Sequence, residues 1–150
     1  MDPVAQLHEA QQQVFGELDL GSWSAVGVAV WRLIDLEQRH VFPAARRCGL
    51  GTNELDPGLS RHALWIALLR CDDHPAWRER MRSTLIDHVA WSGAEVLAQV
   101  CRHLDRDAYD ELGVEMHASS RPAASGHRVI EQDAAERGAA ERPTERPAAA

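Results

Sequence analysis

Four residues of this 150-residue chain have side chains that could together bind a metal ion: His8, Glu37, His62 and His88. Each lies within its own helix-length apolar pattern, and the four are far apart in the sequence. A helical bundle builds a buried metal site in this way, with ligands pointing inward from several facing helices. We therefore expect these four side chains to meet near a common centre inside an all-α fold.

The elements that must position these residues are long helices. Apolar residues recur at helical spacing in four segments: 3–18, 23–41, 56–69 and 75–104. Gly21 and Ser22 provide a turn and an N-cap after the first segment, and the breakers 49–53 and 72–75 follow the second and third. Pro43 either kinks the second helix or ends it. Without strand alternation or a hairpin signal, the pattern predicts an up-down-up-down four-helix bundle.

Composition divides the chain into two parts. Residues 1–118 have the apolar content of one folded domain, in which a short amphipathic helix over 108–116 closes one end of the bundle. Residues 119–150 consist mainly of Ala, Glu, Arg, Pro and Gly, with almost no large apolar side chains. Such a segment buries too little surface to offset its ordering entropy. The sequence therefore predicts a disordered tail over 119–150.

Charge and cysteine content exclude several classes of partner. With 16 basic and 23 acidic residues, the formal net charge is −7, which argues against nucleic acid and against an anionic membrane surface. The three cysteines form an odd set without a C-x-x-C pair, as is typical of a reducing cytosol. Neither a signal-peptide pattern at the N-terminus nor an apolar run of membrane-spanning length is seen. We expect a cytoplasmic protein, and the sequence leaves its oligomeric state open.

Several spacings resemble those of the hemerythrin-like (HHE cation-binding) family, over roughly residues 2–117. Residues 37–43, Glu-Gln-Arg-His-Val-Phe-Pro, are similar to the end of that family's second helix. His62 is followed by apolar residues three, six and seven positions later, as in the family, and 85–88 and 112–113 also match. The resemblance implies a four-helix bundle that holds two irons bridged by carboxylates. It also implies that His8, Glu37, His62 and His88 occupy four of the family's ligand positions.

The chain departs from this family at two ligand positions. Leu33 stands where the second helix has a His, and Ser92 and Gly93 stand where the fourth helix has its acidic pair. Relative to the family, one iron has thus lost an imidazole and one bridge has lost its carboxylate. What remains includes two imidazoles and one carboxylate, a ligand set suited to mononuclear non-heme Fe(II) with open positions. We expect His62, His88 and Glu37 to bind the metal, with His8 as a fourth ligand or as a catalytic acid or base.

Two residues one turn farther along could replace the lost ligands. His40 lies three residues after Glu37, and Glu95 lies seven residues after His88, so a displaced second metal is conceivable. The alternative is that His40 fills a position at the bundle end and Glu95 is solvated. The spacing of the tryptophans indicates a core role for four of them: Trp23, Trp31, Trp65 and Trp91. Two of these, Trp65 and Trp91, follow His62 and His88 by three residues and could also wall the pocket.

Three functional hypotheses follow. In the first, non-heme iron supports oxygen-dependent chemistry on a small molecule, or sensing of O₂, NO or peroxide, which would make the protein an oxidoreductase or a gas sensor. In the second, no metal is bound, and the pocket binds or converts an organic small molecule by acid–base catalysis. There His8, His62 or His88 acts as base and Glu37 orients it. In the third, the domain is a non-catalytic interaction or storage module, and the tail is a tether.

Overall fold

A computed structural model describes residues 1–121, and every regular element in this range is helical. The all-α prediction is confirmed. The elements, in chain order, are α1 (Pro3–Leu20), α2 (Trp23–Leu36), η1 (Glu37–Val41), α3 (Phe42–Arg47), α4 (Thr52–Leu69), α5 (Pro75–Trp91), η2 (Ser92–Leu97), α6 (Ala98–His103) and α7 (Arg106–Ser120). The two η elements are π-helical turns.

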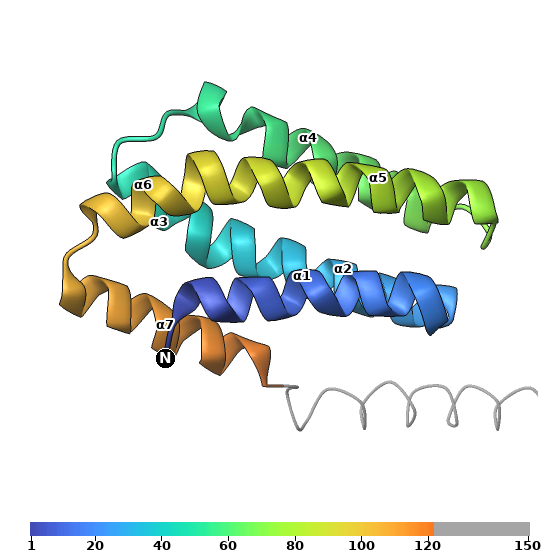
Figure 1. The fold of residues 1–150 in the computed structure, drawn as a ribbon, viewed down its shortest axis with the longest axis horizontal. Helices are drawn as coiled ribbons and strands as arrows, with labels where there is room; N and C mark the ends of the chain where they lie inside the picture. Colours follow the sequence, from blue (N-terminus) through green and yellow to red (C-terminus); the bar gives the residue numbers. More distant parts are fainter. Residues whose placement is uncertain (122–150) are drawn as a thin grey trace, which may run out of the picture. The chain divides into compact units, whose positions relative to one another are not determined.

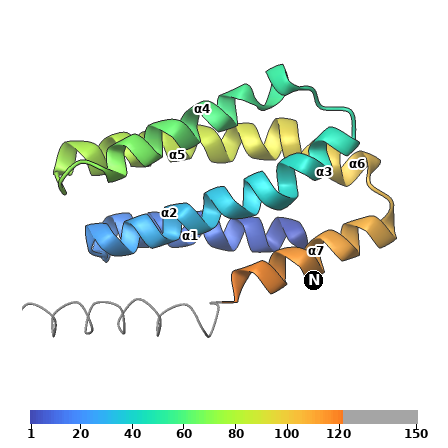
Figure 2. The same cartoon turned by 180° about the vertical axis from the view of Figure 1, so that it is seen from behind.

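The long helices are arranged as two pairs (Figures 1 and 2). The elements α2, η1 and α3 follow one another without a gap and form one continuous helical run, and so do α5, η2 and α6. Consecutive long helices run in opposite directions, with α1 packed on α2 and α4 packed on α5. Contacts between α1 and α5 and between α2 and α4 join the pairs, while α7 lies against α1 and α2. Helices from both pairs therefore face a common interior.

Side-chain caps lie at the start of α1, α2 and α5. The carboxylate of Asp2 accepts a hydrogen bond from the Val4 amide at 2.9 Å at the start of α1. The predicted N-cap Ser22 is confirmed, since its hydroxyl accepts from the Ala25 amide at 3.1 Å. At the start of α5 the ring of His74 takes this role. These caps satisfy backbone donors that have no partner within the helix.

Two helices extend beyond the breakers seen in the sequence. Pro43 does not end the helical run that starts with α2. It lies in the first turn of α3, which follows the wider π turn η1 without a gap. The amide of Phe42 bonds the Glu37 carbonyl five residues back, so the backbone before the proline ring is already opened. Likewise α4 includes Pro57. It begins at Thr52, four residues before the predicted start at residue 56. The true break is Gly49, whose φ of +99° needs a residue without a side chain.

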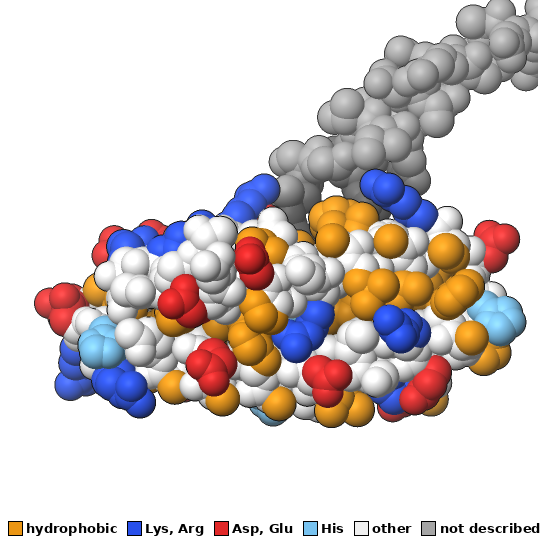
Figure 3. Space-filling view, turned by 90° about the horizontal axis from the view of Figure 1, so that it is seen from above, with side chains coloured by type: hydrophobic (Ala, Val, Ile, Leu, Met, Phe, Trp, Pro, Cys, Tyr) orange, Lys and Arg blue, Asp and Glu red, His pale blue; other side chains and the backbone are white. Residues whose placement is uncertain are grey.

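The core consists of aliphatic and aromatic side chains from every long helix. Leu7, Leu33, Leu55, Leu85 and Met116 are among those that are essentially inaccessible to solvent. The prediction of a core role is wrong for Trp31 on α2, which is 52% exposed. Figure 3 shows hydrophobic side chains reaching the surface between charged ones, gathered toward one half of the face seen there.

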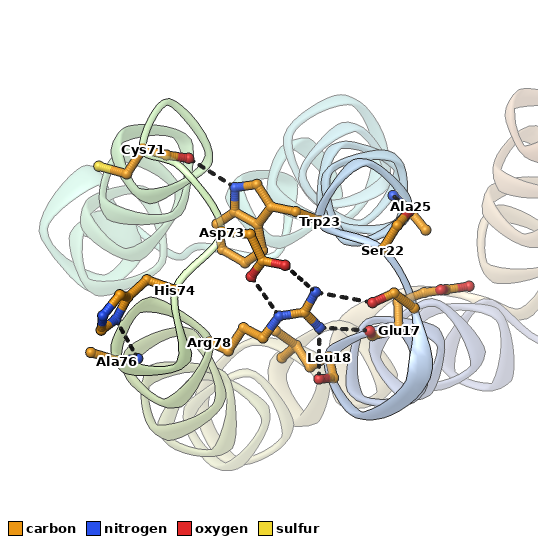
Figure 4. A network of polar contacts seen from close by, with 11 residues as sticks. Glu17, Leu18, Ser22, Trp23, Ala25, Cys71, Asp73, His74, Ala76 and Arg78 are labelled. Carbon is orange, nitrogen blue, oxygen red and sulfur yellow. Dashed lines mark hydrogen bonds and ion pairs between the residues drawn. The ribbon is translucent and has the colours of Figure 1, made fainter.

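Arg78 joins the two helix pairs at the end opposite α7. Its guanidinium donates to the carbonyls of Leu18 and Gly21, each at 3.0 Å, where α1 ends (Figure 4). Asp73 holds the same guanidinium with bonds of 2.7 and 2.9 Å, and the ring of Trp23 lies 5.7 Å from it. A cation beside unpaired carbonyls at a helix C-terminus is electrostatically favourable. Arg78 therefore ties the start of α5 to the end of α1.

The described residues end near the expected domain boundary. Contacts group Met1–Ser120 as one compact unit, and α7 continues through residue 118 to Ser120. The predicted tail therefore begins too early, since residues 119 and 120 belong to α7, and its residues 122–150 lie outside the described residues. Within residues 1–121, no helix combines the length and the apolarity that crossing a membrane requires.

Candidate metal centre

Three of the four expected ligands meet inside the helices. Glu37 on η1, His62 on α4 and His88 on α5 each offer one ligand atom, and these atoms all lie within 4.8 Å of one another. Their side chains are at most 1% exposed. The three residues come from different parts of the chain, so the packing of α2 on α4 and of α4 on α5 creates the group.

The three side chains form a short hydrogen-bonded network centred on the carboxylate. Nε2 of His62 lies 2.6 Å from Oε2 of Glu37. Nε2 of His88 lies 2.8 Å from Oε1 and 2.9 Å from Oε2 of the same carboxylate. Because a carboxylate oxygen only accepts, both imidazoles donate from Nε2 in this arrangement.

Glu37 remains the negative member of this network. Burial by itself raises the pKa of a carboxyl group, and at Glu37 this is the largest single influence. The positive charge that His88 carries when it is protonated, the hydrogen bonds that both imidazoles donate and the charge of a protonated His62 act in the opposite direction and together outweigh it. The pKa of Glu37 is therefore lowered, and the buried group is an anion that attracts a cation.

The outer nitrogens of the two imidazoles have different surroundings. Nδ1 of His62 lies 3.0 Å from the amide nitrogen of Gln38, a residue exposed at the surface. Nδ1 of His88 is buried and has no hydrogen-bond partner within residues 1–121, and neither has the hydroxyl of Ser92, one helical turn farther along. Buried polar atoms without partners are uncommon in proteins. The His88 side of the group is therefore its less satisfied side.

Aromatic rings enclose the two imidazoles. Phe42 stacks on His62 with ring centres 5.5 Å apart and an interplanar angle of 9°. Trp65 meets His88 edge to face at 4.9 Å, and Trp91 lies 5.3 Å from the same imidazole. The expectation that Trp65 and Trp91 line the site is confirmed. These rings exclude water, which strengthens the electrostatic interactions of the group.

The absence of a side chain at Gly58 creates the space for one of these rings. A Cβ built on Gly58 would lie 2.5 Å from Cη2 of Trp91 and 2.9 Å from Cζ of Phe42. Gly58 lies one turn before His62 on α4, so the indole of Trp91 lies across the backbone beside the ligand. This close approach explains a glycine within a helix, where the residue otherwise lowers stability.

Both π-helical turns occur at the site. The first, η1, begins at Glu37 itself, and the second, η2, begins at Ser92, four residues after His88. Such turns are rare, and they are often found at functional sites because they redirect side chains. The two helical runs that supply Glu37 and His88 thus both leave regular α geometry next to their candidate ligand.

His8 does not join the group, which corrects the expectation of four converging ligands. It is exposed on α1, whose buried stripe includes Leu7, Gln11, Val14 and Leu18. Because successive residues of a helix differ by about 100° in direction, burying Leu7 and Gln11 turns His8 toward solvent. The polar residue that α1 places inward is Gln11, whose side chain is 4% exposed.

The possible replacement ligands also lie away from the site. Nε2 of His40 lies 2.8 Å from the hydroxyl of Ser119, and its Nδ1 lies 3.7 Å from a carboxylate oxygen of Glu115, so His40 contacts α7. Glu95 is exposed. The structure therefore supports the alternative for both residues, and a displaced second metal at these two positions has no geometric basis.

Sequence reasoning missed three residues of the site. Gln38 and Phe42 follow Glu37 by one and five residues, and both contact His62 from the π turn η1 or directly after it. In an ideal helix, the spacing of these two residues from Glu37 does not predict that both contact His62. Gly58 could have been noticed, because a glycine four residues before a candidate ligand suggests a close approach.

The geometry of the donor set is compatible with a metal ion. In protein sites, ligands about 2.1 Å from a metal at right angles to one another are about 3 Å apart. The nitrogen–oxygen separations of 2.6–2.9 Å around Glu37 need only a small expansion to reach that spacing. Two imidazoles and one carboxylate suit Fe(II), and also other divalent metals.

Comparison of the chain with family models, with curated proteins and with solved structures gives no match.

Proposed function

We propose that this protein is a hemerythrin-like four-helix bundle with a mononuclear non-heme iron site formed by Glu37, His62 and His88. The observation that supports the proposal is that these three buried side chains bring their ligand atoms within 4.8 Å of one another. The family resemblance of the surrounding residues agrees with it. Leu33, which is fully buried, and Ser92 provide no further imidazole or carboxylate for a second iron.

The proposed role is oxygen-dependent chemistry on a small molecule, or sensing of O₂, NO or peroxide. Iron held by two imidazoles and one carboxylate has open positions, and it supplies the binding and activation of a diatomic gas. The chain's own residues hold the metal and keep water away. Glu37 supplies the negative charge, while Phe42, Trp65 and Trp91 form the apolar wall.

A metal-free acid–base function is the second candidate, and one observation favours it. The Nε2 atoms of both imidazoles already have a hydrogen-bond acceptor in Glu37. A carboxylate that orients an imidazole is a common arrangement for general base catalysis. In this version, His88 is the better base of the two, because its Nδ1 has no hydrogen-bond partner among the described residues.

Iron content separates the two candidates. The protein is purified without oxygen, loaded with Fe(II), freed of excess metal and analysed for iron per chain. We expect a single iron per chain, a changed optical spectrum on adding NO, and at least tenfold weaker binding in Glu37→Gln and His88→Gln. His8→Asn and His40→Asn are the matched controls, since both histidines lie outside the group, and they should bind iron like the natural chain.

Two results would contradict the iron proposal. The first is a chain that retains no metal after reconstitution, although circular dichroism shows that it is folded. The second is a loss of iron in His8→Asn equal to that in His88→Gln. A small-molecule conversion that persists unchanged in strong chelator would favour the acid–base candidate instead.

A further inference from the structure

Gln38 connects the buried group to the surface. Its side chain is exposed, yet its amide nitrogen is 3.0 Å from Nδ1 of His62. From there a continuous series of hydrogen bonds leads through His62 to Glu37 and on to His88. Gln38 thus makes no hydrogen bond to the carboxylate itself, but it contacts the imidazole of His62, which does.

The orientation of this amide determines where the proton of His62 resides. An amide nitrogen only donates, so Nδ1 of His62 must accept, and the ring proton of a neutral imidazole is then on Nε2. A proton on Nε2 is also what the carboxylate of Glu37 requires at 2.6 Å. The hydrogen bonds at the two ring nitrogens therefore require the same tautomer of His62, with Nδ1 unprotonated.

Metal binding requires the opposite tautomer. A metal binds the lone pair of Nε2, so the proton must move to Nδ1, where a proton acceptor is then needed. The ring itself has little freedom to turn over, because it is stacked on Phe42 and packed against Trp65. Gln38 can provide the acceptor by rotating its amide by half a turn, so that its oxygen replaces its nitrogen.

We propose that Gln38 is a positioning residue that holds His62 in the Nε2-protonated form without metal and turns its amide over when a metal binds. The first half concerns the metal-free protein alone, and the second half rests on the proposed metal function. The amide is a neutral outer partner, weaker as an acceptor than a carboxylate, so it lowers the affinity of the site and favours reversible loading.

The test of the first half is a measurement of the ring nitrogens of His62 in metal-free protein. Histidine labelled with ¹⁵N distinguishes a protonated nitrogen from an unprotonated one by chemical shift. We expect an unprotonated Nδ1 that accepts a hydrogen bond in the natural chain, and an unprotonated Nδ1 with the shift of a nitrogen without a hydrogen bond in Gln38→Leu, since Glu37 still holds the proton on Nε2. In Gln38→Glu we expect a protonated Nδ1, because a carboxylate can only accept. Gln12→Leu and Gln12→Glu are matched controls, since Gln12 is exposed on α1.

Metal affinity tests the second half. Competition for Co(II), followed by its visible spectrum, should show about tenfold tighter binding in Gln38→Glu and about tenfold weaker binding in Gln38→Leu. If the His62 shifts in both variants equal those of the Gln12 controls, the positioning role is wrong. If the shifts change as expected but no variant binds Co(II) or Fe(II), the proposed metal function fails and the tautomer assignment stands. If the natural chain, Gln38→Leu and Gln38→Glu bind the metal equally tightly, the proposed rotation of the amide is wrong.

Discussion

At the scale of single residues, Glu37 combines full burial with a negative charge. Its folded pKa lies below the ordinary value of 4.5, while the unfolded chain has that ordinary value. The contribution of the ionised group to stability is therefore complete above about pH 4.5 and is lost as the pH falls through the folded pKa. A carboxylate with this behaviour makes the metal-free protein sensitive to acid.

The Glu37→Gln variant tests this linkage. An amide cannot accept from both imidazoles as a carboxylate does, so we expect the metal-free variant to unfold about 1–3 kcal/mol more easily at pH 7. Urea unfolding from pH 7 to pH 3 should show the difference from the natural chain narrowing below about pH 4.5. The exposed Glu95 provides the control Glu95→Gln, and a difference that stays constant with pH would contradict the argument.

Gly58 is the second residue with a testable role of its own. Gly58→Ala introduces a Cβ where Trp91 and Phe42 already lie, so the indole must move. We expect a loss of about 1–3 kcal/mol in the free energy of unfolding, together with a change in tryptophan fluorescence. Gly16→Ala on α1, with nothing within 4 Å of its Cβ, should instead gain about 0.5–1 kcal/mol. Equal effects in the two variants would refute the packing argument.

At the scale of elements, the helices show how far local pattern extends. The positions of α1 and α5 follow from their caps and apolar spacing, and both begin where the sequence predicts. The start of α4 and the end of the run from α2 to α3 differ from prediction, because tertiary packing tolerates proline inside α4 and after η1. A π turn depends on the packing of the whole helix, so a residue pattern does not locate it.

Arg78 provides a prediction about how these elements are joined. Arg78→Lys keeps the charge but loses the paired bonds to Asp73 and most bonds to the carbonyls at the end of α1. We expect destabilisation by about 1–3 kcal/mol, measured by thermal unfolding. Arg80→Lys, on the same helix but exposed, is the control and should have little effect. A similar small effect in both variants would show that the network adds nothing to stability.

At the scale of the whole molecule, α7 is held to the start of α1 by a few polar contacts. The hydroxyl of Tyr109 donates to the carboxylate of Asp2 at 2.6 Å, and the side chain of Gln6 donates to the carbonyl of Gly113 at 2.7 Å. The bond from Tyr109 lowers the pKa of Asp2, while burial and then the same bond raise the pKa of Tyr109. Because the pKa of Tyr109 is raised in the folded protein, its contribution to stability is complete below the pKa of the unfolded chain. This contribution is lost as the pH rises through the folded pKa.

Because the chain contains a single tyrosine, this contact can be followed directly. Phenolate absorbance should appear at higher pH than for free tyrosine, and Asp2→Asn should bring it back toward the ordinary value. Tyr109→Phe should destabilise the protein by about 0.5–1.5 kcal/mol and speed hydrogen exchange in α7 more than in α4. An ordinary titration of Tyr109 in the natural chain would contradict the contact.

The sequence alone determined the helical class, the approximate positions of the long helices and three of the residues that meet at the centre. These properties depend on apolar spacing, caps and residue chemistry, which are local. The tertiary structure decided that His8 faces solvent and that Gln38, Phe42 and Gly58 belong to the site. The rotation of α1 and the two π turns cause these differences. Both result from the fit of whole helices against one another, which no single segment specifies.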